Sequence, residues 1–401
     1  MANNGNSNDN PLPRRNPTTR FTEAGLREKL ETQFFTETEG RTDLLNGMSE
    51  VERRDLLREM LNYLISTDSM LLSRQERIRL VDAAYRNLFE FGPLRPLFDE
   101  PTLTEIDIRS ALEVFSRSSS GESILTDVKF DDSSHLERVF RGILNQLGYD
   151  LKRDPFIETG MIVAYRRIRL SLLALSPAQP PQITIRVHPT EQLTLNQLIV
   201  GGTLNEQAAT ILRDHLAAGR GLMIAGDAGA GKTTLLGALL RELPSISIMV
   251  VERAAELALP EGAQSLHAQR EKTFAQQISA AVERKPAWLI IDEVRFDESA
   301  EMWAAITSEA KPGLLWAFRG SSDPLRLRTA FGMAVRRAHP TIGQEIIHSG
   351  LVDRLPLVAL LAREGREGRE GRPRLMQIGK WEAVDGDLAR LTLHPLWTKS
   401  T

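Results

Sequence analysis

The sequence contains no cysteine among its 401 residues. This absence excludes disulfide bonds, thiolate zinc sites and a cysteine nucleophile, and it is compatible with a reducing compartment. Long apolar runs are missing too, because no segment approaches the roughly 20 apolar residues that span a bilayer. The N-terminal stretch is polar and has no apolar centre, so we predict no secretory signal there. We therefore expect a soluble, cytoplasmic protein, which still permits docking on a membrane protein.

A large excess of positive charge is also lacking. The 50 basic residues nearly balance 53 acidic residues, which gives a formal net charge of -3. Proteins that bind nucleic acid usually carry a basic domain or a basic face, so the composition argues against a nucleic-acid partner. The seven histidines form no cluster typical of a metal site. The 41% of hydrophobic residues is enough for two or three domains with their own cores.

The first part of the chain divides into a polar tail and a helical region. Residues 1–20 are rich in Asn, Pro and Arg, and we predict that they are disordered. Residues 21–92 are predicted to be helical, because Ser49 with Glu52 and Ser73 with Glu76 form capping boxes before apolar runs. The apolar residues at helical spacing after these boxes are Leu56, Leu57, Met60, Leu61, Leu64, Ile78, Val81, Tyr85 and Leu88.

Residues 93–195 have a different texture and are predicted to form an α+β domain. Prolines punctuate its beginning, and short β-prone runs follow one another. A helix is expected within residues 129–147, where Leu136, Val139, Phe140, Ile143 and Leu147 are spaced to face one side. The runs expected to form strands are residues 103–110, 111–117, 122–130, 161–173 and 182–187.

Residues 203–401 are predicted to form an α/β domain. Apolar strands alternate with helical segments, which is typical of βαβ units and a mostly parallel sheet. The charged repeat REGREGREGR at 363–372 is interpreted as an exposed β-hairpin tip or a flexible loop. The segments that carry this pattern are a helix near 204–216, a strand at 221–226, a helix at 232–243, and strands at 246–252 and 287–293.

The segment GDAGAGKTT at 226–234 matches the phosphate-binding pattern G-x-x-x-x-G-K-T. It follows an apolar strand and opens a helix, so its backbone N–H groups and the helix dipole are predicted to hold phosphate oxygens. Lys232 is expected to reach the β- and γ-phosphates of ATP, and the Thr233 hydroxyl to coordinate Mg²⁺. The predicted nucleotide-binding residues are Gly226, Asp227, Ala228, Gly229, Ala230, Gly231, Lys232, Thr233 and Thr234.

Acidic residues end two of the predicted strands. Asp292 and Glu293 close the segment AWLIIDE, and ligands of open α/β sheets bind at that end of the strands. We predict that Asp292 binds Mg²⁺ through water and that Glu293 polarises the attacking water. Glu252, which ends the segment ISIMVVE, is a second catalytic candidate.

Four segments, in order along the chain, resemble the secretion-superfamily ATPases of type II and type IV systems, in particular the motors of tight-adherence (Flp) pili and of type IV secretion. FGPLRPLFDEPTLTEIDI resembles the beginning of that family's N-terminal domain. QITIRV, followed by LTLNQLIVGGTLN, resembles its last N-terminal strand and linker. VVERAAEL is similar to the acidic box E-D-x-x-E-L, and IIDEVRFDESAEMWAAI to the Walker B segment G-E-x-R-x-x-E.

The resemblance implies an α/β fold, with a RecA-like P-loop ATPase domain preceded by an α+β N-terminal domain and a small helical region. It implies a homo-oligomer, normally a hexamer, that binds ATP between the two domains and pushes on an inner-membrane platform protein. By position, Glu252 matches the acidic-box glutamate and Glu293 the Walker B glutamate. Arg186 and Arg167 match N-terminal-domain arginines that approach the phosphates, where a guanidinium suits a phosphate partner.

The chain departs from this pattern at several positions. Arg253 stands where the acidic box usually has Asp, and Asp292 replaces the Walker B glycine. Glu, Ala and Lys at 309–311 replace a T-G-H element, and Arg319 stands at the histidine-box position. These departures concern hydrolysis more than ATP binding. Our hypothesis is that Arg319 takes over the role of the histidine as a γ-phosphate sensor.

Three alternatives to a hydrolysing motor remain open at this point. In the first, the chain is a degenerate paralogue that binds ATP but hydrolyses it poorly and has a regulatory or structural role. A RecA-like nucleic-acid motor is compatible with the P-loop and the IIDE strand alone. An interaction protein with a vestigial P-loop is the third alternative, which protection against heat by ATP·Mg²⁺ would exclude.

Overall fold

The computed structural model describes residues 22–399, except for 40, 42–44, 46, 69, 120, 152, 174–180, 190–191, 245 and 366–370. The tail at 1–20, predicted to be disordered, lies outside the described residues. By their contacts the residues group into two compact units. The first comprises residues 1–92 with 138–142, and the second comprises 93–137 with 143–401. The division of the second unit into two domains stays a prediction.

Three helices form most of the first unit: α1 (Glu23–Thr38), α3 (Glu50–Thr67) and α4 (Arg74–Phe89). Both predicted capping boxes are confirmed, since Ser49 caps α3 with Glu52 and Ser73 caps α4 with Glu76. Each serine side chain accepts the N–H of its glutamate, and each glutamate carboxylate accepts the serine N–H. These reciprocal bonds satisfy backbone donors that the first helical turn leaves free, and so they fix where both helices begin.

The apolar residues noted after the second capping box lie in α4, as the predicted helical region requires. Val81, Tyr85 and Leu88 are buried in the core of this unit, whereas Ile78 is 51% exposed. Ile78 lies near the beginning of α4, and Leu80 instead begins the row of buried residues that continues with Ala84 one turn later. Leu57, Met60 and Leu61 are buried as expected, whereas Leu56 and Leu64 are half-buried at the edge of the core.

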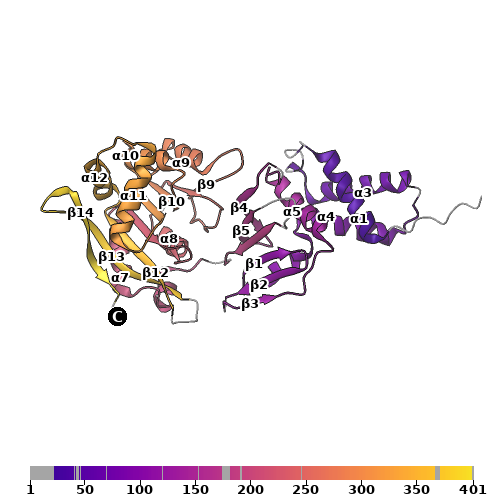
Figure 1. Ribbon diagram of the computed structural model, residues 1–401, viewed down its shortest axis with the longest axis horizontal. Coiled ribbons are helices and arrows are strands. Elements are labelled where there is room, and N and C mark those ends of the chain that lie inside the picture. Colours follow the sequence, from indigo (N-terminus) through magenta and orange to yellow (C-terminus); the bar gives the residue numbers. More distant parts are fainter. Residues whose placement is uncertain are drawn as a thin grey trace, which may run out of the picture. The chain divides into compact units, whose positions relative to one another are not determined.

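The second unit begins with an antiparallel sheet of six strands in the order β3-β2-β1-β6-β5-β4 (Figure 1). Ile106, Ile108, Ile183 and Ile185 are fully buried along its central strands. The polar side chains alternate with them, which is the pattern of a sheet with one apolar face. The elements are a 3₁₀ helix (Gly92–Asp99), β1 (Leu103–Ser110), β2 (Glu113–Ser118), β3 (Ser123–Leu125), α5 (Ser133–Gln146), β4 (Phe156–Val163), β5 (Arg166–Leu173) and β6 (Gln182–Val187).

Two strand predictions in this sheet were wrong, and for the run 122–130 only Ser123–Leu125 forms a strand. The β-prone run 161–173 is not a single strand, because it turns at Ala164 and Tyr165 and its two halves belong to β4 and β5. Both turn residues have positive φ, 48° and 64°. Two-residue hairpins of this kind usually carry Gly, Asn or Asp, so Ala164 and Tyr165 contain no turn pattern to recognise.

The rest of the second unit contains a sheet of eight strands in the order β14-β13-β12-β7-β11-β10-β8-β9. The six strands from β12 to β9 pair in parallel, whereas β12, β13 and β14 pair antiparallel. The predicted mostly parallel sheet is therefore confirmed. Its strands are β7 (Leu222–Gly226), β8 (Ile248–Glu252), β9 (Gln264–His267), β10 (Trp288–Val294), β11 (Gly313–Arg319), β12 (Leu357–Glu364), β13 (Arg372–Val384) and β14 (Asp387–Thr398).

Helices cover both faces of this sheet (Figure 1). Leu222 and Ile224 of β7 pack into one apolar core, while Met223 and Ala225 pack into the other. Strands buried on both faces are typical of an α/β domain, and they explain the continuous apolar runs in the sequence. On the first face lie α6 (Leu195–Val200), α7 (Glu206–Ala217) and α8 (Lys232–Leu240), and on the second α9 (Phe274–Glu283), α10 (Ser299–Thr307), α11 (Pro324–Ala338) and α12 (Gln344–Arg354).

The sheet order brings the functional candidates together. The carboxyl ends of β7, β11, β10 and β8 meet at one edge, which is where ligands bind to open α/β sheets. At the other side of β7, Glu364 pairs with Arg372, so the charged repeat belongs to a hairpin as predicted, with 366–370 outside the described residues. Within the described part of the chain, no helix has both the length and the apolar character required to cross a membrane.

Candidate nucleotide-binding site

The loop between β7 and α8 has the geometry of a phosphate cradle. Gly231 forms the N-cap of α8 with φ of 91°, a conformation that favours glycine. A Cβ at this position would lie 2.9 Å from Cβ of Pro373, so a larger residue would need its neighbours to move. No side chain caps α8, and its first N–H groups therefore remain available to an anion.

Lys232 is the first residue of α8, and its side chain lies over the loop. The residue is only 7% exposed, and its Nζ donates to the carbonyls of Gly226 at 2.9 Å and Asp227 at 2.8 Å. Burial lowers the pKa of Lys232, the charge of Glu293 opposes this shift, and the charge of Arg319 adds to it. Hydrogen bonds thus hold the ammonium group of Lys232 at the loop. The charges of Glu293 and Arg319, which lie on other strands of the sheet, both affect its pKa.

The remaining loop residues lie around this lysine. Asp227, Ala228 and Gly229 form the exposed rim of the loop, and Thr233 is half-buried in the first turn of α8. Arg363, at the end of β12, donates from Nε to the carbonyl of Gly229 at 2.8 Å. Sequence reasoning missed Arg363, because it stands at the start of the charged repeat that was interpreted as a surface hairpin.

Arg319 ends β11, directly beside the P-loop strand. Its backbone pairs with Gly226, and its exposed side chain is close enough for its charge to lower the pKa of Lys232. The residue at the histidine-box position is therefore a cation at the edge where a γ-phosphate is expected.

Asp292 and Glu293 point to different surroundings, since adjacent residues of a strand face opposite ways. Asp292 is 4% exposed, and its Oδ2 accepts the backbone N–H of Arg253 at 2.8 Å. Its buried Oδ1 has no hydrogen-bond partner among the described residues. Burial raises the pKa of Asp292 well above its usual range, and the charges of Glu252 and Glu256 add to the shift.

Glu293 is the acid whose charge acts most strongly on Lys232. Its Oε2 accepts from Nη2 of Arg295 at 2.6 Å and lies 3.6 Å from Nη2 of Arg169. Burial alone would raise the pKa of Glu293, but the hydrogen bond and charge of Arg295, with the charge of Arg169, lower it overall. Glu293 is therefore an ionised carboxylate held by arginines.

Arg169 of β5 is a site residue that sequence reasoning did not single out. Its Nε donates to Glu158 at 3.1 Å and its Nη1 to Glu256 at 3.0 Å, and its side chain is only 14% exposed. Burial would lower the pKa of Arg169, but Glu256 and Glu158 raise it, so the guanidinium stays charged. Arg167 and Arg169 alternate in the segment RRIRLS, which places them on one strand face, and this pattern was available in the sequence.

The two predicted phosphate-binding arginines lie near Arg169. Arg167 is half-buried, and its charge lowers the pKa of Glu252, against the larger effect of burial, which raises it. Arg186 is exposed, pairs across the sheet with Arg169, and has its Nε 3.6 Å from Glu105. In the described part of the chain, no hydrogen bond or ion pair joins Arg186 to the P-loop. Phosphate contact by both arginines stays a prediction.

Glu252 lies inside the protein and already has partners. It is 1% exposed, its Oε1 accepts the N–H of Leu257 at 2.7 Å, and its Oε2 accepts from Ser265 Oγ at 2.7 Å. These bonds fold the acidic-box loop back onto the end of β8. A catalytic role for Glu252 stays a prediction, and its present contacts are those of a residue that holds a loop.

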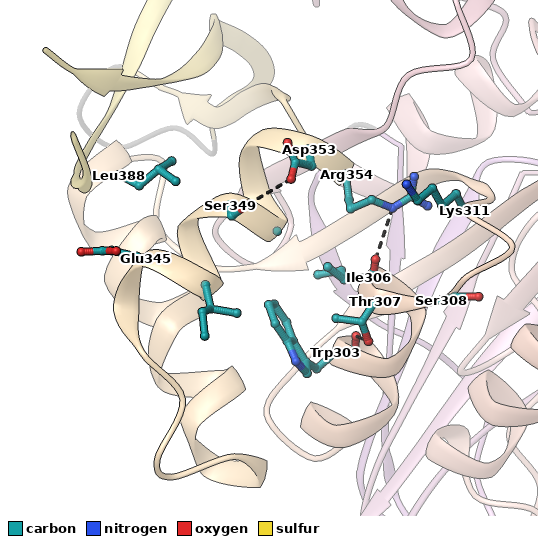
Figure 2. Close-up of a pocket in the computed structure, with 12 residues that line it drawn as sticks. Trp303, Ile306, Thr307, Ser308, Lys311, Glu345, Ser349, Asp353, Arg354 and Leu388 are labelled. Carbon is teal, nitrogen blue, oxygen red and sulfur yellow. Dashed lines mark hydrogen bonds between the residues drawn. The ribbon is translucent and has the colours of Figure 1, made fainter. Parts of the chain in front are cut away.

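A separate pocket opens between α10 and α12 (Figure 2). Trp303 and Ile306 of α10 face Ser349 and Arg354 of α12, and Ser349 Oγ donates to Asp353 at 3.0 Å. None of the predicted nucleotide-binding or catalytic residues lines this pocket. It is thus distinct from the P-loop site.

Residues 159–311 match the family described as type II/IV secretion system protein. Over these residues the chain is similar to the type II/IV secretion ATPase superfamily. The matched residues contain the P-loop, Glu252, Asp292 and Glu293, so this superfamily shares the segment that carries the site.

Individual relatives in the superfamily are distant. A putative conjugal transfer protein of Mycobacterium tuberculosis is 26% identical over 320 residues, covering 75% of this chain and 87% of that protein. The type IV secretion system protein VirB11 of Brucella suis is 23% identical, covering 65% of this chain and 81% of that protein. The crystal structure of the pilus retraction motor PilT with bound ADP has a TM-score of 0.54 at 14% identity, covering 76% and 82% of the two chains. This last likeness confirms the fold class, a RecA-like domain preceded by an N-terminal domain.

Proposed function

We propose that this chain binds ATP with Mg²⁺ at residues 226–234 and hydrolyses it as a motor subunit of a secretion or pilus-assembly machine. The observation that carries the proposal is the meeting of the P-loop lysine and Glu293 at one sheet edge, where the charge of Glu293 acts on Lys232. The conjugal transfer and VirB11 relatives support the secretion role.

The residues present fit ATP and Mg²⁺. The uncapped start of α8 and Lys232 suit the phosphates, as the loop geometry indicates. Among the described residues, no group of three or more His, Asp or Glu side chains is arranged to hold a metal. Mg²⁺ commonly keeps several waters and uses phosphates with one or two protein oxygens, so the Thr233 hydroxyl would hold the ion and the free Oδ1 of Asp292 would bind one of its waters. The ion would neutralise charge on the β- and γ-phosphates.

In the proposed reaction, each charged side chain of the site has a separate role. Lys232 exchanges its two carbonyl contacts for phosphate oxygens, and Arg319 supplies a second cation to the γ-phosphate. Glu293, held ionised by its arginines, accepts a hydrogen bond from the attacking water and orients it. Arg169 and Arg167 bring positive charge from the antiparallel sheet.

The proposed assembly is a homohexamer that works on the cytoplasmic side and docks on an inner-membrane platform protein, without a nucleic-acid partner. A second function has one observation in its favour. The 2.6 Å bond from Arg295 occupies the Glu293 carboxylate, which suits a paralogue that binds ATP but hydrolyses it slowly.

Steady-state ATPase activity and ATP·Mg²⁺-dependent thermal stabilisation, each compared with Lys232→Ala, separate these possibilities. We expect both activity and stabilisation in the wild type and neither in the variant. Stabilisation without turnover would favour the slow paralogue. The absence of both would contradict the proposal, and salt-dependent binding of single-stranded DNA would favour a nucleic-acid motor instead.

A further inference from the structure

Arg253 contacts three segments near the carboxyl ends of the strands: the end of β10, the turn before α10, and α9. It follows β8, and its side chain is 12% exposed. Its Nε donates to the carbonyl of Glu293 at 3.1 Å, and its Nη2 donates to the carboxylate of Glu298 at 2.7 Å. The guanidinium lies 4.1 Å from the ring centre of Phe274, which supports it from α9.

Glu298 transmits this contact to the turn that follows Glu293. The residue is 1% exposed and stands at the N-cap of α10. Its Oε1 accepts the backbone N–H of Arg295, which closes the turn, and its Oε2 binds Arg253. A buried carboxylate without a cation is costly, so Arg253 stabilises the charge that closes this turn.

We infer that Arg253 is a positioning residue for Glu293. One guanidinium fixes the carbonyl of Glu293 directly and, through Glu298, the backbone of Arg295. Arg295 is in turn the residue whose side chain binds the Glu293 carboxylate. Arg253 thus determines where the carboxylate of Glu293 lies relative to Lys232, and it does so through protein groups, the Glu293 carbonyl and Glu298. The inference rests on the proposed function, in which Glu293 orients the attacking water.

The contacts of Arg253 also explain why an arginine stands where the acidic box usually has Asp. The resembling pattern has Asp here, and an acid would face the buried Glu298 and lie next to Asp292, whose Oδ2 accepts the backbone N–H of residue 253. Like charges in a buried cluster destabilise it, whereas the guanidinium supplies the cation that two buried carboxylates need. The departure is therefore compatible with a working site.

Three variants test this role: Arg253→Met, Arg253→Lys, and Arg284→Met as a matched control. Arg284 is exposed at the end of α9, and in the described part of the chain its side chain hydrogen-bonds Gln264 alone. We expect Arg253→Met to lower kcat for ATP at least about tenfold, because small misplacements of a catalytic group have large effects. KM and ATP·Mg²⁺-dependent stabilisation should change less than about twofold, because the P-loop is untouched. Arg253→Lys should recover part of kcat, since an ammonium reaches only one of the two acceptors well.

A second measurement keeps the inference testable if the wild type proves inactive. Hydrogen exchange of a peptide covering residues 293–299 reports directly on the turn that Glu298 closes. Exchange should accelerate in Arg253→Met and stay unchanged in Arg284→Met. Unchanged exchange, or equal losses of kcat and of ATP·Mg²⁺-dependent stabilisation, would overturn the positioning role. Faster exchange in a chain without ATPase activity would instead count against the proposed function alone.

Discussion

The phosphate-binding loop and the acidic ends of β8 and β10 lie at the same sheet edge, but they are built in different ways. The loop uses backbone groups, glycine conformations and a helix start, all within nine consecutive residues. The acidic end of β10 uses side chains whose partners come from β5, from the turn after β10 and from the residue after β8. A site made from one segment can be recognised in a sequence, whereas a site made from distant side chains can change its residues and keep its contacts.

The sharpest test of this comparison removes the loop's one buried charge. Lys232→Ala should abolish ATP hydrolysis and the stabilisation by ATP·Mg²⁺, which amounts to about 2.7 kcal/mol at 100 times Kd. Thermal unfolding with and without nucleotide measures it, with the exposed Lys272→Ala as a control. Retained stabilisation in Lys232→Ala would mean that ATP binds elsewhere.

Replacing Glu293, the acid at the end of β10, should lower ATP turnover and leave ATP binding unchanged. Glu293→Gln keeps the size of the side chain but weakens its hold on water, so we expect kcat to fall by roughly 10²-fold with ATP binding intact. Single-turnover hydrolysis and nucleotide titration measure the two effects. Loss of ATP binding in this variant would show that the two ends of the site are not independent.

The arginine shared by the acids should matter for stability. Arg169→Met removes the guanidinium that pairs with both Glu158 and Glu256, and we expect a loss of about 3 kcal/mol in the free energy of unfolding. Denaturant unfolding measures the loss, and Arg169→Met with Glu256→Gln should be less destabilised than the single variant. An additive double variant would contradict a coupled pair.

The smallest effect is expected at Arg319, which is exposed. Arg319→Ala should weaken the preference for ATP over ADP by about tenfold, or about 1.4 kcal/mol, if the guanidinium contacts the γ-phosphate. Competition binding of the two nucleotides measures the preference. The sensor hypothesis fails if both ATP affinity and ATPase activity stay at wild-type values.

The same comparison explains how much the sequence alone could predict. The P-loop, both capping boxes and the parallel sheet follow from local spacing and were predicted. The hairpin at Ala164 and Tyr165 was missed, because residues without a turn preference adopt positive φ there. Arg253 appeared in the sequence only as a departure from a family pattern.

The partner of that arginine explains why. Glu298 is 45 residues away along the chain, and only the pairing of β8 with β10 brings the two residues together. The alternation of Arg167 and Arg169 was visible, but two of the acids that Arg169 faces, Glu256 and Glu293, lie outside its sheet. Spacing thus predicts which residues share a strand face, whereas the identity of their partners depends on tertiary packing.

The position of β11 has one more consequence. Strands in a sheet lie about 4.8 Å apart, so a single intervening strand sets the axes of β7 and β10 about 10 Å apart. This strand spacing sets the separation between Lys232, which follows β7, and Glu293, which lies on β10. It leaves room for a terminal phosphate with a water behind it, and it places the end of β11, Arg319, beneath the middle of that space. A chain in which β7 and β10 were direct neighbours would close this space, whatever residues stood at their ends.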